Sequence, residues 1–280
     1  MRFWLGVAFL QPDELLDMAR VADDSGYHGI AVSDHVFYPE KLSTPYPYTA
    51  DGAPPFAPDT PWPDPWVLIG AMAAVTTRLR FMTNVYVAPA RNPLLVAKQV
   101  STAAVLSGDR VALGVGAGWM REEFEHLGQR FGDRGRRLDE MIDVMRALWR
   151  GGMVEHHGEH YDLDRLQMSP VPARPVPIYC GGQSRAALER AARLDGWIGN
   201  AYTPDQALEL VGRVRRSRED RGFEVIISLK AAPDADLYRR MEDAGVTGLL
   251  CAPWMRPGAA DPAARRAAVE RFSETVIAVT

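Results

Sequence analysis

The sequence predicts a closed (β/α)8 barrel, in which eight parallel strands are each followed by a helix. Short apolar runs alternate with longer amphipathic runs along the chain, which is typical of a parallel sheet with helical crossovers. Eight such units follow one another, and they fit a closed barrel better than an open doubly wound sheet. The length of 280 residues also suits one barrel, so we expect residues 1–280 to form a single domain.

The strands are predicted from apolar runs that are too short for helices. The predicted strands are residues 3–9, 29–33, 79–85, 111–115, 176–180, 196–199, 224–229 and 246–251. Because the carboxyl ends of barrel strands meet on one face, polar residues just beyond these runs are candidates for a common site.

The helices are predicted from apolar residues at helical spacing and from start signals. Asp64, Asn92 and Asp261 each precede a proline, which places an N-cap before Pro at the first helical position. Thr203 and Gln206 form a capping box. The predicted helices are residues 13–25, 64–75, 94–106, 136–150, 184–194, 203–220, 235–244 and 261–278.

Two segments interrupt this alternation. Residues 36–63 follow the second strand, are rich in Pro, Tyr and Phe, and lack a helical period. Long loops of this kind are usually functional, so we expect the aromatic residues of this segment to line a pocket or form a lid, with an ordered surface loop as the alternative. These residues are Phe37, Tyr38, Tyr46, Tyr48 and Phe56. Residues 151–174 precede the fifth strand and are expected to form a small hairpin.

Composition excludes several classes of protein. Apolar residues make up 47% of the chain and charged residues 24%, as in ordinary globular proteins. The formal charge of −4 argues against a nucleic-acid partner. No uncharged apolar stretch is long enough for a membrane span, and no signal peptide is recognisable. With only two cysteines, Cys180 and Cys251, a reducing cytoplasm is the expected compartment.

Asp34 and His35 form the pair richest in chemistry, at the end of the second strand. A histidine titrates near neutral pH and can pass a proton to a reacting centre. The neighbouring carboxylate is a candidate for orienting it, although adjacent strand residues point to opposite faces. The alternative is an Asp that caps local backbone beside a hydrogen-bonded His.

Glycines dominate two other strand ends. Gly116 and Gly118 follow the fourth strand without completing a dinucleotide fingerprint, and we interpret them as leaving room for a flat ring. Gly181, Gly182, Gln183 and Ser184 precede a helix, where free N–H groups favour a phosphate, although a simple turn has the same composition.

A metal site is disfavoured. His156 and His160 have a spacing that suits two ligands on a helix, but Gly158 and the missing helical period argue for a solvated hairpin. Cys180 and Cys251 end strands and are expected to be small buried side chains rather than nucleophiles.

Four blocks of sequence resemble the bacterial luciferase-like monooxygenase superfamily. They are GYHGIAVSDHV (26–36), AKQVSTAAVLSGDRVALGVGAGWMREEF (97–124), RGRRLDEMIDVMRALWRG (134–151) and PVPIYCGGQSRAALERAARLDGWI (175–198). Within the superfamily the set is most similar to the oxidoreductases of actinobacteria that depend on the deazaflavin coenzyme F420. The flavin-dependent members share the same barrel.

The resemblance implies a ring bound at the carboxyl face of the barrel and two-electron hydride transfer. It places Asp34 and His35 by the ring, with His35 as proton donor or acceptor. It also implies a non-proline cis peptide between Asn84 and Val85 behind the ring, and usually a homodimer. The cofactor-binding residues are then expected to be Asp34, Asn84, Val85, Gly116, Gly118, Gly181, Gly182, Gln183, Ser184 and Asn200.

Two departures bear on the substrate. Sugar-phosphate dehydrogenases of the superfamily carry a glutamate after the glycines of the fourth strand, where this chain has Trp119. They also carry a tryptophan shortly after the Asp-His pair, where this chain has Pro39. We therefore expect an apolar small-molecule substrate, in a pocket formed by Trp119, Phe37 and Tyr38.

Three rival functions remain open at this stage. One is an FMN-dependent monooxygenase supplied by a separate flavin reductase, and another is a non-catalytic flavin-binding protein on the same barrel. A metal-dependent hydrolase is a more distant rival, because no convincing ligand set lies at the strand ends.

Overall fold

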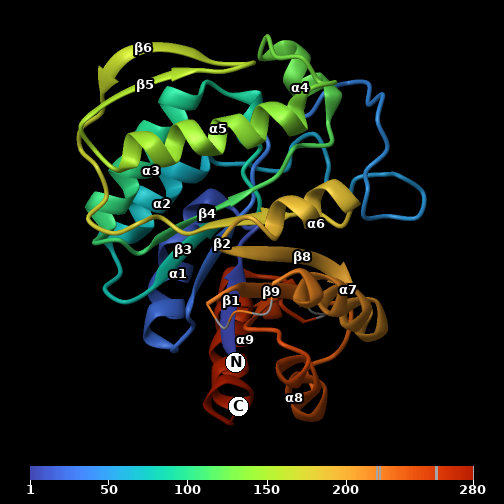
Figure 1. Ribbon diagram of the computed structural model, residues 1–280. Coiled ribbons are helices and arrows are strands. Elements are labelled where there is room, and N and C mark those ends of the chain that lie inside the picture. The colour runs from blue at the N-terminus through green and yellow to red at the C-terminus, as the bar shows by residue number, and fades with distance from the viewer. Residues whose placement is uncertain (219, 221, 256–257, 280) are drawn as a thin grey trace.

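The computed structural model describes residues 1–218, 220, 222–255 and 258–279. Eight parallel strands form a closed barrel, and β1 pairs with β10 to complete it, as the sequence predicts (Figure 1). The barrel strands are β1 (Arg2–Gly6), β2 (Gly29–Val32), β3 (Arg80–Thr83), β4 (Val111–Val115), β7 (Ile178–Gly181), β8 (Gly196–Tyr202), β9 (Glu224–Leu229) and β10 (Gly248–Cys251).

Helices surround the barrel on the outside (Figure 1). They are α1 (Leu15–Asp24), α2 (Pro65–Ala74), α3 (Pro93–Ser107), α4 (Arg121–His126), α5 (Arg134–Trp149), α6 (Arg185–Ala191), α7 (Pro204–Ser217), α8 (Ala235–Asp243) and α9 (Pro262–Thr275). Short 3-10 helices occur at Pro12–Glu14, Ala88–Ala90, Pro253–Met255 and Ile277–Val279. None of the helices in the described residues is long and apolar enough to cross a membrane.

The predicted start signals act as caps. The Asp64 side chain accepts hydrogen bonds from the backbone N–H groups of Trp66 and Val67, and Asn92 does the same for α3. The capping box of Thr203 and Gln206 is present at the start of α7. These contacts are local, which explains why the sequence predicts the helix starts well.

Several predicted bounds are wrong. The first strand ends at Gly6 rather than at residue 9, because Phe9 has a φ of 73° that a strand cannot contain. β8 continues to Tyr202, three residues beyond the predicted end at residue 199. Residue 219, within the predicted helix 203–220, lies outside the described residues, and α7 ends at Ser217. The short helix α4 was not predicted at all.

Side chains fill the inside of the barrel. Strand residues that point inward form one buried cluster, which consists of Trp4, Ala31, Met82, Ala112, Tyr179, Ile198 and Ile226. Gly29 makes room for the largest of them, since a Cβ at Gly29 would lie 2.4 Å from the Trp4 ring. The barrel is thus a packed core, and any large cavity must lie at one of its ends.

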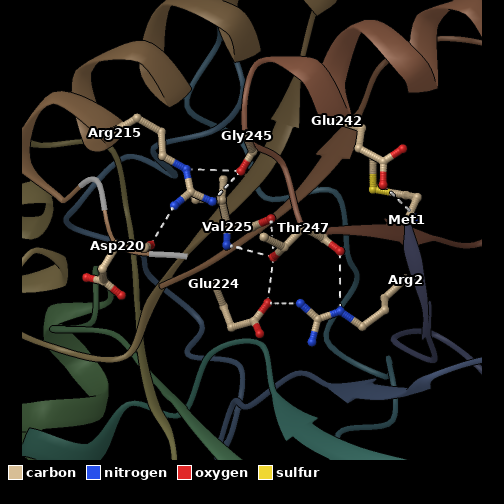
Figure 2. Close-up of polar contacts among 9 residues, drawn as sticks. All are labelled: Met1, Arg2, Arg215, Asp220, Glu224, Val225, Glu242, Gly245 and Thr247. Carbon is tan, nitrogen blue, oxygen red and sulfur yellow. Dashed lines mark hydrogen bonds and ion pairs between the residues drawn. The ribbon is translucent and has the colours of Figure 1, made fainter. Parts of the chain in front are cut away.

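The amino-terminal end of the barrel is closed by polar contacts (Figure 2). Arg2 forms an ion pair with Glu224, and the Thr247 hydroxyl donates a hydrogen bond to the same carboxylate. The backbone N–H of Val225 donates to the Thr247 hydroxyl at 2.9 Å. These contacts connect the first residues of β1 and β9 with the segment that leads into β10.

The two interrupting segments differ in structure. Residues 36–63 contain no helix or strand. Residues 151–174 contain the predicted hairpin, formed by β5 (Met153–His157) and β6 (Asp162–Gln167), which lies outside α5 (Figure 1). His156 contacts Glu140 of α5 at 3.0 Å, and no cluster of metal-binding side chains occurs in the described residues. Neither cysteine forms a disulfide bond. Cys180 is buried as expected, whereas Cys251 is only half-buried, so the expectation of a buried side chain is wrong there.

Candidate active site

A cavity of about 1230 Å³ opens at the carboxyl end of the barrel strands. Twelve of the fourteen site residues predicted from the sequence line it, which is what the barrel topology leads one to expect. They are Asp34, His35, Asn84, Val85, Gly116, Gly118, Trp119, Gly181, Gly182, Gln183, Ser184 and Asn200. Phe37 and Tyr38 are not among the lining residues.

His35 lies just beyond the end of β2, and its side chain is 10% exposed. Its ring packs among three aromatic rings, with centroid distances of 5.1 Å to Phe56, 5.1 Å to Trp62 and 5.9 Å to Trp119. Nδ1 lies 3.2 Å from Oε1 of Glu123, whereas Nε2 has no hydrogen-bond partner among the described residues. His35 therefore lines the cavity with one ring nitrogen engaged and the other available to a ligand.

Asp34 does not contact the His35 ring. Its two carboxylate oxygens accept hydrogen bonds from the Arg91 guanidinium, each at 2.8 Å, and one also accepts from the Val87 N–H at 2.9 Å. Burial raises the pKa of Asp34 above its ordinary value, although Arg91 and the Val87 N–H act in the opposite direction. The Asp34 side chain is only 1% exposed. It therefore connects the end of β2 to the segment after β3 and is poorly placed to contact a substrate directly.

The side chain that contacts Nδ1 of His35 is Glu123, which sequence reasoning missed. Glu123 lies in α4 and is 2% exposed. Its Oε1 also accepts a hydrogen bond from the backbone N–H of Val36 at 2.8 Å. The REEF sequence at 121–124 carries no signal that separates Glu123 from the exposed acids beside it, because α4 is too short for a helical period.

The floor of the cavity is formed by Val85. The Asn84–Val85 peptide is cis, as the resemblance implies. A Cβ at Gly116 would lie 2.5 Å from one Val85 methyl, and a Cβ at Gly181 would lie 2.6 Å from the other. Gly116 and Gly181 therefore make room for the Val85 side chain. The sequence-based interpretation instead assigns Gly116 to a flat ring and Gly181 to a phosphate. Val85 in turn presents an apolar surface to the cavity.

A Cβ at Gly118 would contact Val87 and Phe124 at 2.6–2.7 Å, and Gly118 has a φ of 85°. Local packing and the positive φ therefore both require a glycine at position 118.

One rim of the cavity is polar. Asn200 accepts a hydrogen bond from Ser228 at 2.8 Å, and Lys230 follows at the end of β9. Ser184 caps α6 by accepting from the backbone N–H of Ala187 at 3.2 Å, and its O–H can still donate to a ligand. Gly182 has a φ of 111°, a conformation that favours glycine. Backbone and amide groups, rather than acids, characterise this rim.

The opposite wall is aromatic and comes from the segment 36–63. Tyr46, Tyr48, Phe56 and Trp62 of this segment line the cavity. The segment is attached to α4 and the residues before it, because Thr44 donates to the Trp119 carbonyl at 2.9 Å and the Ser43 N–H donates to Glu122 at 2.7 Å. Burial raises the pKa of Tyr46 to about 12, so its hydroxyl is neutral at physiological pH.

Phe37 and Tyr38 support this wall from outside the cavity. The Phe37 ring lies 5.4 Å from His126 on α4, and the Tyr38 ring lies 5.9 Å from Phe56. Of the five aromatic residues that the sequence predicts around a pocket, Tyr46, Tyr48 and Phe56 line the cavity, whereas Phe37 and Tyr38 do not. Trp62 also lines the cavity and was not predicted.

The sequence profile of the luciferase-like monooxygenase family matches residues 5–275. An uncharacterized protein of Mycobacterium tuberculosis is 40% identical over 287 aligned residues, which cover 99% of both chains. The F420-dependent glucose-6-phosphate dehydrogenase of Nakamurella multipartita is 31% identical over 90% of this chain and 73% of its own. The barrel, the cavity at its carboxyl end and these matches agree, and the chain belongs to the luciferase-like monooxygenase family.

Solved structures with the same fold include the monooxygenase RslO1 from Streptomyces bottropensis, with a TM-score of 0.76, 17% identity and coverage of 100% of this chain and 99% of the other. An F420-dependent secondary alcohol dehydrogenase, in complex with an F420-acetone adduct, has a TM-score of 0.74 and 17% identity, with full coverage of both chains. At 17% identity, these structural matches show a shared fold and no more.

Proposed function

We propose that this protein is an F420-dependent oxidoreductase that transfers a hydride between the deazaflavin ring and a small apolar organic substrate. In this proposal His35 gives or takes the proton that accompanies the hydride. The observation that carries the proposal is the position of His35, which lines a large cavity beside aromatic rings and close to an apolar floor. Its Nε2 has no hydrogen-bond partner among the residues that the structure describes.

The residues of the cavity fit a flat tricyclic cofactor. Val85 provides an apolar surface, and a residue larger than glycine at 116 or 181 would displace it. The cavity of about 1230 Å³ is large enough for a ring and a small substrate. Asn84, Val85, Gly116 and Gly118 would contact the ring, and Gly181, Gly182, Gln183, Ser184 and Asn200 would hold the rest of the cofactor. When bound, the deazaflavin supplies a carbon centre that exchanges a hydride with substrate.

The choice of F420 is supported by the 31% identical relative, which is named as F420-dependent. Its sugar-phosphate substrate does not carry over, because the aromatic wall and Trp119 favour an apolar substrate. We expect an apolar secondary alcohol or ketone to lie against Trp62 and Trp119, with its oxygen toward Nε2 of His35. Asp34 then contributes by holding the end of β2 in place.

The first test is a side-by-side binding titration of the purified protein with F420 and with FMN. Binding of F420 at least about tenfold tighter than that of FMN supports the proposal, since such a ratio equals about 1.4 kcal/mol of preference. The bound protein is then assayed with 1-phenylethanol and acetophenone as apolar probes and with glucose 6-phosphate as the polar comparison. Tighter FMN binding contradicts the F420 assignment.

An FMN-dependent monooxygenase supplied by a flavin reductase is the alternative, favoured by the shared fold with RslO1 and with an FMN complex of a Pseudomonas putida Baeyer-Villiger monooxygenase. Oxygen uptake coupled to substrate, with reduced FMN, would support this alternative. A non-catalytic flavin-binding protein would instead retain its cofactor and turn over none of the probes.

We also propose a homodimer. The outer faces of α2 and α3 expose large apolar side chains, with exposed fractions of 74% for Val67, 65% for Leu95 and 72% for Leu106. Large exposed apolar side chains on two helices that pack together, as α2 and α3 do, are typical of a protein interface. Analytical ultracentrifugation of the wild type and of Leu106→Glu tests this proposal, with a shift of the variant toward monomer as the expected result.

A further inference from the structure

Glu123 is a buried carboxylate to which the function proposed above assigns no role. It is 2% exposed, and its Oε1 contacts both the Val36 N–H at 2.8 Å and Nδ1 of His35 at 3.2 Å. Across the described ranges of the chain, no lysine or arginine forms an ion pair with it, and His35 is its partner. Burying a carboxylate is costly unless donors compensate it, so these two contacts account for its position.

The contact with Nδ1 selects one tautomer of His35. An ionised carboxylate only accepts hydrogen bonds, so the hydrogen of the neutral ring lies on Nδ1. Nε2 is then the nitrogen with a free lone pair, and it is the nitrogen without a hydrogen-bond partner in the described residues. The three aromatic rings around His35 restrict the ring plane, whereas the carboxylate decides which nitrogen carries the hydrogen.

We propose that Glu123 is the positioning residue for proton transfer by His35, an inference that rests on the proposed function. When a substrate hydroxyl loses its proton, the O–H bond breaks and a bond forms between that hydrogen and Nε2. The resulting imidazolium donates from Nδ1 to the full negative charge of Glu123, which stabilises it. In the reverse direction the same proton returns from Nε2 to the oxygen. Glu123 itself exchanges no proton.

A purely structural role is the competing explanation, because Glu123 also attaches the start of the 36–63 segment to α4 through Val36. The neighbouring Glu122 provides a matched control. It attaches the same segment to α4 through the Ser43 N–H at 2.7 Å, but it does not touch His35. Glu122 variants therefore lose a charge and an attachment of the segment while the His35 contact remains.

The first experiment measures the His35 tautomer by long-range proton–nitrogen NMR in the cofactor-free protein. The chain has six histidines, and His35 is assigned by the signal missing in His35→Gln. We expect the Nδ1–H tautomer in the wild type and in Glu122→Ala, and a mixture of tautomers in Glu123→Ala. If Glu123→Ala does not fold, the wild-type spectrum decides alone, because an Nε2–H tautomer there overturns the proposal.

The second experiment separates charge from hydrogen bonding. In Glu123→Gln the amide oxygen can still accept from Val36 and Nδ1, so the tautomer should persist while the negative charge is lost. We expect kcat with F420 and 1-phenylethanol to fall about tenfold to a hundredfold, with KM and the Kd of F420 within about threefold of wild type. Glu122→Gln should keep the wild-type kcat.

Equal kcat in Glu123→Gln and Glu122→Gln overturns the proposal even if the tautomer is as expected, since the charge then stabilises nothing in the reaction. The tautomer measurement needs no cofactor, so it reports on Glu123 independently of the proposed function. If His35 variants retain full turnover, the proposed function fails instead, and that result is distinct from a wrong tautomer.

Discussion

Charged side chains are arranged differently at the two ends of the barrel. At the amino-terminal end Arg2 pairs with Glu224, and the amino group of Met1 pairs with Glu242 (Figure 2). A cavity of only about 430 Å³ lies there, next to Arg2 and His28. At the carboxyl end the cavity is about 1230 Å³, and one nitrogen of the His35 imidazole has no partner in the portion of the chain that the structure describes.

This comparison separates stability from chemistry. At the amino-terminal end, the polar groups of Glu224, Val225 and Thr247 are hydrogen-bonded to one another. These bonds join segments that are far apart in sequence, so they help to hold the barrel closed. At the carboxyl end Nε2 of His35 and the buried Nε1 of Trp62 have no hydrogen-bond partner within the described part of the chain. Aromatic rings surround them, which is the arrangement of a ligand site. Substitutions at the two ends should therefore affect different measurements.

The largest expected effect is on turnover, from His35→Gln. We expect kcat with F420 and an apolar alcohol to fall at least about a hundredfold, because the proton acceptor is lost. The Kd of F420 and the melting temperature should stay close to those of the wild type. His126→Gln, an exposed histidine on α4, is the control. Wild-type turnover in His35→Gln would remove the assigned role.

The next effect tests the floor of the cavity through Gly116→Ala. The new methyl would lie 2.5 Å from Val85, so Val85 must shift into the cavity. We expect F420 to bind about tenfold more weakly by titration, an effect typical of overpacking. Gly132→Ala, where a Cβ meets nothing within 4 Å, is the control. Unchanged affinity would show that Val85 does not support the cofactor.

A second substitution in the same background sharpens this test. Val85→Ala combined with Gly116→Ala removes the clash, so part of the lost affinity should return. If the double variant binds F420 no better than Gly116→Ala, the effect of the new methyl does not pass through Val85.

Glu224→Ala should affect stability rather than turnover. The substitution removes the carboxylate that pairs with Arg2 and that accepts a hydrogen bond from the Thr247 hydroxyl. Arg2 and Thr247 are both partly exposed. We expect the free energy of unfolding to fall by about 1–2 kcal/mol in a denaturant titration, with kcat unchanged. A loss of turnover without a loss of stability would contradict the separation between the two ends.

The smallest effect concerns pH. Burial, with Arg2 and Arg80 nearby, lowers the pKa of His28 from 6.5 to about 4. Between these values the unfolded chain binds a proton that the folded chain does not, so the stability from this group is lost as the pH falls from 6.5 toward 4. Because His28 is partly exposed, we expect this effect to lower the free energy of unfolding by only about 1 kcal/mol between neutral pH and pH 4.

Replacement His28→Gln should therefore make the melting temperature fall less steeply between neutral pH and pH 4 than it does in the wild type. Parallel melting curves over this range for the two proteins would contradict the assignment, because another group must then account for the acid sensitivity.

Local signals allowed most of the elements to be predicted. β4 and β9 have the predicted bounds, because each is an apolar run with clear breaks on both sides. Helix starts at Asp64 and Asn92 were also found, since a cap contacts residues only two or three positions ahead. Helix α4 was missed because six residues are too few to show a period.

The site was predicted only in part. Topology brings the strand ends together, so residues such as His35, Gly116 and Gly181 were identified from their places beyond the strands, whereas Asn84 and Val85 were identified from the family resemblance. Topology does not say where a side chain points or which residue it contacts. Phe37 and Tyr38 were therefore expected in the cavity together with Tyr46, Tyr48 and Phe56, but only the last three line it. Trp62 lines the cavity as well and was not predicted.

The sequence by itself determined the class of fold, the order of its elements and the face that carries the cavity, because these follow from hydrophobic periodicity and short-range caps. The tertiary structure alone decided the partners of the two central residues. Asp34 pairs with Arg91, 57 positions away, and His35 pairs with Glu123, 88 positions away. Such contacts depend on side-chain direction and burial after the barrel has closed, and no local pattern encodes them.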